Sequence, residues 1–189
     1  MALEGGAVHV WLADLDALGD RLDGLLDYRE LQRAGRIVRV PARRRWTAAR
    51  GALRALLGVY LDEDPTALRF ARGSHGKPSL DPHTGLHFNL SHSGGVAIYA
   101  LTKLCPIGVD VELVVSATGR PRSVDFLRAW VRAEADGKRT GAGVRSGLPP
   151  SEAAQTGSWI SEISVGAGAV AAIALASAPV DFQVYAIDF

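Results

Sequence analysis

Hydrophobic and polar positions along the chain follow two distinct periods. Residues 8–12 alternate between apolar and polar or aromatic side chains, as a strand with one buried face does. Over residues 43–60 the apolar positions instead recur every three to four residues, which predicts a helix with one apolar stripe. The stripe consists of Ala49, Leu53, Leu56, Leu57 and Tyr60. Arg45, Arg50 and Arg54 lie on the other sides of this helix, where we expect them to be free to reach an anion.

The same two periods predict the remaining elements. We expect helices over 20–31 and 125–138, a strand that begins near residue 68, and strands over 86–90, 96–101, 107–113, 159–165 and 170–176. Short connections between these strands favour antiparallel pairing. A strand, a helix and then antiparallel strands occur on each side of residue 106. The sequence therefore predicts an α+β fold with two halves, 1–105 and 106–189.

The composition is that of an ordinary globular protein. Hydrophobic residues make up 48% of the chain and charged residues 22%, with a net charge of +1, which excludes a mainly disordered chain. The arginines between residues 29 and 54 indicate either an anion partner, nucleic acid or a polyphosphorylated small molecule, or a solvated helix face. Cys105 is the only cysteine, so no internal disulfide can form. No signal-peptide pattern is evident, and both features favour the cytoplasm. The most apolar run, 165–178, is shorter than the about 20 residues that span a bilayer, so we expect no membrane association.

The candidate chemistry lies in two neighbouring segments. Residues 88–93 read Phe-Asn-Leu-Ser-His-Ser, and residues 107–112 read Ile-Gly-Val-Asp-Val-Glu. On a strand, Asp110 and Glu112 project from the same face. Such a pair suits Mg²⁺, which binds one or two carboxylates together with water and phosphate oxygens. The pattern indicates chemistry on a phosphate-bearing substrate, and exposed edge-strand carboxylates are the alternative.

Several motifs occur in the order typical of one enzyme family. They are Gly-Lys-Pro at 76–78, Phe-Asn-Leu-Ser-His-Ser at 88–93, Gly-Val-Asp-Val-Glu at 108–112 and Trp-Val-Arg-Ala-Glu-Ala at 130–135, followed by Lys138 and Gly-Ala-Gly at 141–143. Together they resemble the 4'-phosphopantetheinyl transferases, in the form of the larger type that activates nonribosomal peptide and polyketide synthases. The resemblance covers the chain from about Arg43 onward.

The resemblance implies a reaction and a fold. These enzymes move the 4'-phosphopantetheine arm of coenzyme A onto a serine of an apo acyl or peptidyl carrier protein and release adenosine 3',5'-bisphosphate, with Mg²⁺ as cofactor. Their fold has two similar α+β halves related by a pseudo-twofold axis, each with a small, mainly antiparallel sheet and a packed helix, and coenzyme A binds between the halves. We expect a cytoplasmic monomer with no nucleic-acid or membrane partner.

The resemblance also implies roles for individual residues. Asp110, Glu112 and Glu134 match the magnesium-binding carboxylates, and Glu134 also matches the proposed general base. Lys138 matches a lysine near the diphosphate. The implied coenzyme A positions are Arg45, Arg50, Lys77, Pro78, Ser91 and His92, with Arg45 and His92 near the 3'-phosphate. A base, a metal cation and a cationic side chain are what the attack of serine on a diphosphate requires.

The chain departs from the family pattern in two places. Ala133 stands where the family often has a lysine, so one phosphate-directed cation is missing, and Arg132 lies about 100° round the helix from that position. The connection from Glu112 to Trp130 is also shorter than usual. These departures favour, as an alternative, a non-catalytic coenzyme A or nucleotide-binding protein derived from the family. The retained Glu134 and Lys138 argue against it.

Other interpretations of the same residues have less support. Ser91 and His92 are adjacent on a strand and so point to opposite faces, which disfavours a serine hydrolase. The histidines and Cys105 lack any recognised zinc-ligand spacing. A nucleic-acid-binding domain built on the arginines would lack interleaved aromatic residues. Without the resemblance, Glu134 and Lys138 would be an ordinary pair on a helix surface.

Overall fold

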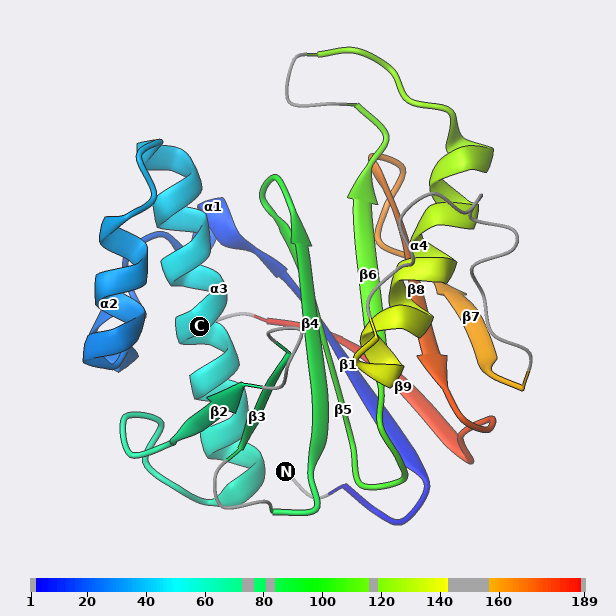
Figure 1. Ribbon diagram of the computed structural model, residues 1–189, viewed down its shortest axis with the longest axis horizontal. Coiled ribbons are helices and arrows are strands. Elements are labelled where there is room, and N and C mark those ends of the chain that lie inside the picture. Colours follow the sequence, from blue (N-terminus) through cyan, green and yellow to red (C-terminus); the bar gives the residue numbers. More distant parts are fainter. Residues whose placement is uncertain (1–2, 73–76, 81–83, 116–118, 143–156, 188–189) are drawn as a thin grey trace.

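A computed structural model describes residues 3–72, 77–80, 84–115, 119–142 and 157–187. Two sheets lie side by side, with helices on the outer side of each (Figure 1). The strand order is β4-β5-β1-β9 in the first sheet and β6-β8-β7 in the second, and β2 pairs with β3 in a small separate ribbon. This arrangement confirms the predicted α+β class with small, mainly antiparallel sheets.

The first sheet is built on an antiparallel hairpin. Its strands are β1 (Ala7–Asp14), β4 (His87–Ser93), β5 (Val96–Thr102) and β9 (Asp181–Ala186). β5 pairs antiparallel with both β1 and β4, as the short connections predict, whereas β9 pairs parallel with β1. β9 was not predicted, although it belongs to the first sheet. A division at residue 105 therefore leaves this late strand beside the N-terminal half.

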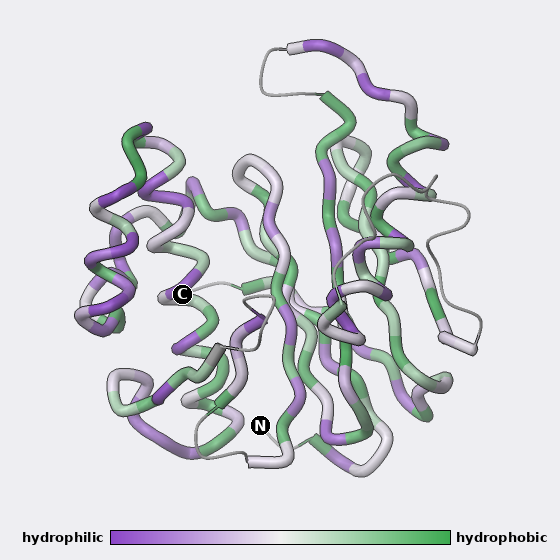
Figure 2. Tube along the Cα trace, viewed as in Figure 1, coloured by the Kyte–Doolittle hydropathy of each residue, from purple (hydrophilic) through white to green (hydrophobic). Residues whose placement is uncertain are grey.

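The helix α3 (Val40–Leu61) covers one face of the first sheet. Its predicted apolar stripe is confirmed, because Ala49, Leu53, Leu56 and Leu57 are buried in one cluster with Phe88 and Tyr99 of the sheet. Pro41 stands in the first turn, where a proline fits without loss of a hydrogen bond, and Asp62 ends the helix in the left-handed conformation. Apolar positions follow α3 and the strands, while α2 is largely hydrophilic (Figure 2).

The single helix predicted over 20–31 is wrong. The structure has α1 (Leu15–Leu18), the 3₁₀ helix η1 (Asp23–Leu25) and α2 (Tyr28–Gly35) in this region. Asp14 caps α1 and Asp27 caps α2, the latter in a capping box with Glu30. An N-cap residue has non-helical backbone angles, so Asp27 interrupts any helix that crosses it.

The second sheet packs between α4 and the first sheet. Its strands are β6 (Gly108–Leu113), β7 (Trp159–Ile163) and β8 (Ala169–Leu175), and α4 spans Val124–Thr140. Val131 and Ala135 of α4 lie on Ala172 and Ala174 of β8. The opposite face of this sheet forms a core with the first sheet, to which Val8, Val10, Ile98, Val109, Val111 and Ile173 contribute. The ribbon of β2 (Phe70–Arg72) and β3 (Pro78–Leu80) flanks α3, and β3 was not predicted. No helix in the described ranges is long and apolar enough to span a membrane.

Gly108 allows α4 to lie directly on β6. A Cβ atom at this position would overlap the backbone of α4 at Ala135 and Arg139. We expect Gly108→Ala to lower the free energy of unfolding by about 3 kcal/mol, the upper end of the usual range for overpacking, because two backbone segments must move apart. The matched control is Gly168→Ala, since nothing lies within 4 Å of a Cβ atom there. Equal urea midpoints for the two variants would contradict this view of the contact.

Candidate active site

The candidate site lies on the seam where β4 of the first sheet runs beside β6 of the second (Figure 1). Side chains rather than a backbone ladder bridge the two strands. Asn89 Oδ1 accepts a hydrogen bond from the Val109 N–H (2.9 Å), Ser91 Oγ lies 2.8 Å from Asp110 Oδ1, and Ser93 Oγ lies 3.2 Å from Glu112 Oε2. Alternate residues of the motif at 88–93 thus face β6, and the last two of them meet the side chains of Asp110 and Glu112. This contact confirms that Asp110 and Glu112 share one face.

Asp110 is the most deeply buried carboxylate of the seam. Its side chain is 7% exposed, and Oδ1 lies 2.6 Å from Lys138 Nζ. Lys138 also donates to Ser91 Oγ (2.9 Å), and the Ser91 hydroxyl in turn donates a hydrogen bond to Asp110 Oδ1. Oδ2 is buried and has no hydrogen-bond partner within the described residues. Burial raises the pKa of Asp110, the contacts with Lys138 and Ser91 lower it, and the charge of Glu112 raises it further.

Glu112 binds a cation that the sequence did not predict. Arg122 Nη1 lies 2.7 Å from Glu112 Oε2, and both side chains are partly exposed. Arg122 stands just before α4, where its N–H donates to the carbonyl of Val114 (2.8 Å). Nothing in the sequence around residue 122 signals this contact, because the segment has no periodic pattern.

Glu134 lies on α4 and is half-buried. Burial raises its pKa most, followed by the charge of Asp110; Lys138 lowers the pKa, and Glu112 raises it again. The three carboxylates therefore lie within electrostatic reach of one another. Even so, the described part of the chain contains no group of three His, Cys, Asp or Glu side chains arranged to hold a metal ion. Asp110 and Glu112 instead each bind a protein cation.

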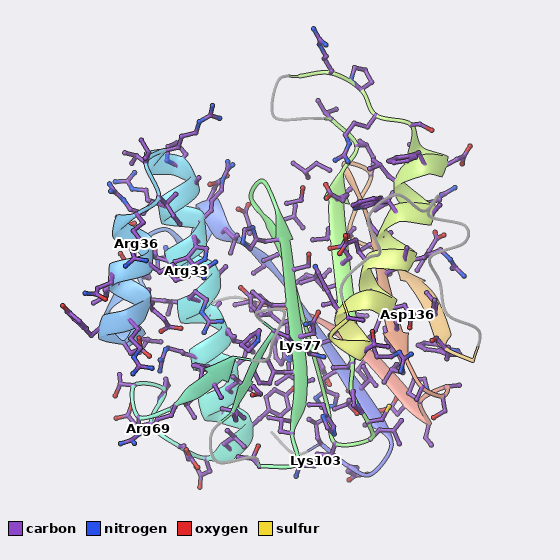
Figure 3. The ribbon with its side chains drawn as sticks, viewed as in Figure 1. Arg33, Arg36, Arg69, Lys77, Lys103 and Asp136 are labelled. Carbon is purple, nitrogen blue, oxygen red and sulfur yellow. The ribbon has the colours of Figure 1, made fainter. Side chains whose placement is uncertain are left out.

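Lys77 lies near the centre of the molecule (Figure 3). Its ammonium donates to the carbonyls of Ile107 (2.9 Å) and Arg139 (3.3 Å). Burial, and then the charge of Arg139, lower the pKa of Lys77 to about 8. Lys77 thus joins the start of β6 to the end of α4, a structural contact that the sequence analysis did not predict.

Arg50 and Arg54 are not free on the surface of α3, so that prediction is wrong for both. Arg50 donates to Glu30 Oε1 through Nε (2.8 Å) and Nη2 (2.5 Å), and Arg54 Nε donates to Glu30 Oε2 (2.6 Å). Arg54 is completely buried and also binds Asp27 and the carbonyls of Pro65 and Leu68. The capping residues of α2 thus neutralise the arginines of α3, a pairing that helix periodicity cannot reveal.

A cavity of about 380 Å³ lies between α2, α3 and the strands β2, β3 and β4. Three arginines and two aromatic rings line it together with two carboxylates and Pro78; these charged and aromatic residues are Arg29, Arg33, Arg50, Trp46, Phe70, Asp27 and Glu30. The Arg33 guanidinium lies 5.8 Å from the Trp46 ring centre, and Figure 3 shows Arg33 with Arg36 on the helical side of the molecule. In the sequence, Arg29 and Arg33 are distinguished only as members of the arginine cluster between residues 29 and 54. Cations beside aromatic rings can bind an anionic nucleotide.

Arg45 and His92 do not line this cavity. Arg45 precedes Trp46 and makes two hydrogen bonds of 2.7 Å to Asp16, both near solvent. His92 is exposed, whereas Ser91 is buried at the seam, which confirms that the two side chains point to opposite faces of β4. His92 shares its face with Leu90, which lines the cavity. Although the His92 side chain reaches the surface, neighbouring groups partly shield its ring from water, and this desolvation, followed by the charge of Lys138, lowers the pKa of His92.

Comparisons with known proteins point to one enzyme family. No family model matches the chain. The chain is 34% identical to the 4'-phosphopantetheinyl transferase HetI of Nostoc sp. over 172 residues, which cover 76% of this chain and 73% of the relative. It is 32% identical to the 4'-phosphopantetheinyl transferase AcpT of Escherichia coli (53% of this chain, 60% of the relative). It is 30% identical to the mouse L-aminoadipate-semialdehyde dehydrogenase-phosphopantetheinyl transferase (61% and 40%). With the motifs at 88–93 and 108–112 joined at the seam, this similarity shows that the chain belongs to the 4'-phosphopantetheinyl transferase family.

Proposed function

We propose that the chain transfers the 4'-phosphopantetheine arm of coenzyme A to a serine of an apo acyl or peptidyl carrier protein and releases adenosine 3',5'-bisphosphate. The observation that carries the proposal is the seam itself. There Asp110 binds Lys138, both charges act on the pKa of Glu134, and the other face of β4 borders the arginine-lined cavity. A diphosphate bound at the seam would meet Glu134 as the base and Lys138 as the cation.

Glu134 is the proposed base and Lys138 the proposed cation at the phosphates. The serine hydroxyl of the carrier would lose its proton to a Glu134 carboxylate oxygen as its oxygen attacks the β-phosphorus of coenzyme A. The phosphate oxygen of adenosine 3',5'-bisphosphate would leave, and the Lys138 ammonium would offset the charge on it. The raised pKa of Glu134 suits this role, because a base works best when its pKa approaches the working pH.

One structural observation supports Mg²⁺ at these residues, although their side chains are not arranged to hold an ion in this structure. Asp110 Oδ2 is buried and without a partner among the described residues, and the carboxylates of Asp110 and Glu112 both raise the pKa of Glu134. Asp110, Glu112 and Glu134 would hold the ion, which when bound offsets charge on the diphosphate. Lys138 and Arg122 already bind two of these carboxylates, so the ion would have to share them.

Coenzyme A would lie with its nucleotide end toward the cavity. The proposed contacts are Arg45, Arg50, Lys77, Pro78, Ser91 and His92, and the structure adds Arg29 and Arg33 as candidates. Pro78, Arg50, Arg29 and Arg33 line the cavity. A phosphate would compete with Asp16 for Arg45, with Glu30 for Arg50 and with backbone carbonyls for Lys77. Guanidinium groups bind phosphates through two hydrogen bonds, which favours the arginines as the main contacts.

The wider architecture is part of the same proposal. Residues 1–105 would form the half with the coenzyme cradle and 106–189 the half with the carboxylates, related by a pseudo-twofold axis. A long helix on a small, mainly antiparallel sheet in each half supports this division, apart from β9. We also propose that the protein is a cytoplasmic monomer of the larger type, with no nucleic-acid or membrane partner.

Mass spectrometry tests the function directly. An apo carrier protein incubated with the chain, coenzyme A and Mg²⁺ should gain the fixed mass of one phosphopantetheine arm. Coenzyme A binding without any mass gain on several apo carriers would favour the non-catalytic alternative. Oligonucleotide binding with a steep salt dependence and no coenzyme A binding would instead favour a nucleic-acid-binding role for the arginines.

A further inference from the structure

Two protein cations hold the carboxylate pair of β6. Lys138 Nζ lies 2.6 Å from Asp110 Oδ1, and Arg122 Nη1 lies 2.7 Å from Glu112 Oε2. Lys138 matches a position of the family pattern, whereas Arg122 matches none. Arg122 therefore adds a positive charge to the seam at a place where the family pattern does not call for one.

The backbone around Arg122 is held, while its side chain is partly solvated. The Arg122 N–H donates to the Val114 carbonyl, Val115 and Pro121 form a β-bridge, and Ser123 caps α4 directly afterwards. The guanidinium side chain is 34% exposed and that of Glu112 is 26% exposed. Ion pairs with this degree of exposure contribute only about 0–1 kcal/mol, so another ion can displace one partner at low cost.

The position of the missing family lysine cannot supply a cation in this chain. Ala133 is 1% exposed and carries no charge. Its neighbour Arg132 projects about 100° round α4 from it. Within the described residues, Arg122 is the arginine that contacts a carboxylate of the seam, that of Glu112.

We propose that Arg122 is a positioning residue that exchanges between Glu112 and the phosphates of coenzyme A. This inference rests on the proposed function. A divalent cation at Glu112 and the Arg122 guanidinium repel each other and compete for Oε2. A guanidinium displaced from Glu112 lies beside the seam, where it can bind a phosphate through two hydrogen bonds and replace the charge lost at Ala133.

The exchange predicts opposite effects on two ligands when Arg122 is replaced. Calorimetry without coenzyme A measures the affinity for Mn²⁺, used as a probe for Mg²⁺. Arg122→Gln should bind Mn²⁺ about two- to fivefold more tightly, because the metal no longer has to break an ion pair worth about 1 kcal/mol. With Mn²⁺ saturating, the same variant should bind coenzyme A about three- to tenfold more weakly, because a charge-assisted contact to phosphate is lost. A purely structural role for Arg122 would not move the two affinities in opposite directions.

Two further variants serve as controls. Arg122→Lys keeps the charge, so its Mn²⁺ affinity should stay near that of the parent, and it should recover part of the coenzyme affinity. Arg128→Gln removes an arginine of α4 that pairs with Asp125 and Glu162, away from the seam, and should change neither affinity. Thermal unfolding of each variant shows whether the fold is intact.

Failure of the inference and failure of the proposed function are distinguishable. Suppose that the parent chain binds both Mn²⁺ and coenzyme A. If at least one of the two affinities does not shift in the stated direction in Arg122→Gln, the exchange is wrong and the function stands. A parent chain that binds neither ligand would overturn the function, and the exchange with it.

Discussion

Glu134→Gln should lower the rate of phosphopantetheine transfer by about 10²–10⁴-fold, the range that general-base catalysis contributes. Glutamine keeps the size of the side chain and one oxygen, but it cannot accept the serine proton. Raising the Mg²⁺ concentration should therefore not restore turnover. The measurement is the initial rate of holo carrier formation, followed by mass spectrometry at several Mg²⁺ concentrations.

Asp110→Ala is the matched comparison for this loss. It removes a proposed metal ligand and leaves the proposed base, so its rate should recover in part at high Mg²⁺. Near-normal transfer by Glu134→Gln at saturating Mg²⁺ would show that another group takes the proton. The two variants thus separate metal binding from proton transfer at neighbouring carboxylates.

The pH profile gives a second test of Glu134. Burial and the charges of Asp110 and Glu112 raise its pKa, while Lys138 opposes them. A base is active in its deprotonated form, so kcat/KM should rise with pH through this raised pKa and level off above it. The rising limb should disappear in Glu134→Gln. A limb that is unchanged in the variant would assign the titration to another residue.

Glu30→Gln should lower the free energy of unfolding by about 3–5 kcal/mol, because it removes the carboxylate that two buried guanidinium groups share. Arg50 and Arg54 both bind the Glu30 carboxylate, whose side chain is 5% exposed. Glutamine keeps an oxygen for the Asp27 N–H of the capping box, so the variant isolates the loss of charge. Urea unfolding measures the effect.

Asp20→Asn is the surface control for this network. Asp20 pairs with Arg44 at 3.6 Å, and both side chains are more than half exposed. Its removal should change the free energy of unfolding by less than about 1 kcal/mol. A similar small change in Glu30→Gln would mean that water or another group satisfies the two arginines. Because α2 also carries Arg29 and Arg33 of the cavity wall, loss of this network should loosen the proposed coenzyme cradle as well.

Local patterns in the sequence determined most of the helices and strands and the direction of side chains within them, but not β3, β9 or the break between α1 and α2. The apolar period of residues 43–60 predicted α3 and its buried stripe, since a helix repeats every 3.6 residues whatever it packs against. Alternation along strands placed Asp110 and Glu112 on one face and separated Ser91 from His92. These properties depend on residues that are near in the chain.

Only the tertiary structure decided which charged groups meet. Glu30 neutralises Arg50 and Arg54 from another helix, and Lys77 binds the carbonyl of Arg139, 62 residues away. β9 lies beside β1 although almost the whole chain separates them. Arg122 reaches Glu112 because its segment turns back before α4. A charge carries no information about its partner until packing sets the distance between them, and periodicity along the chain does not record that distance.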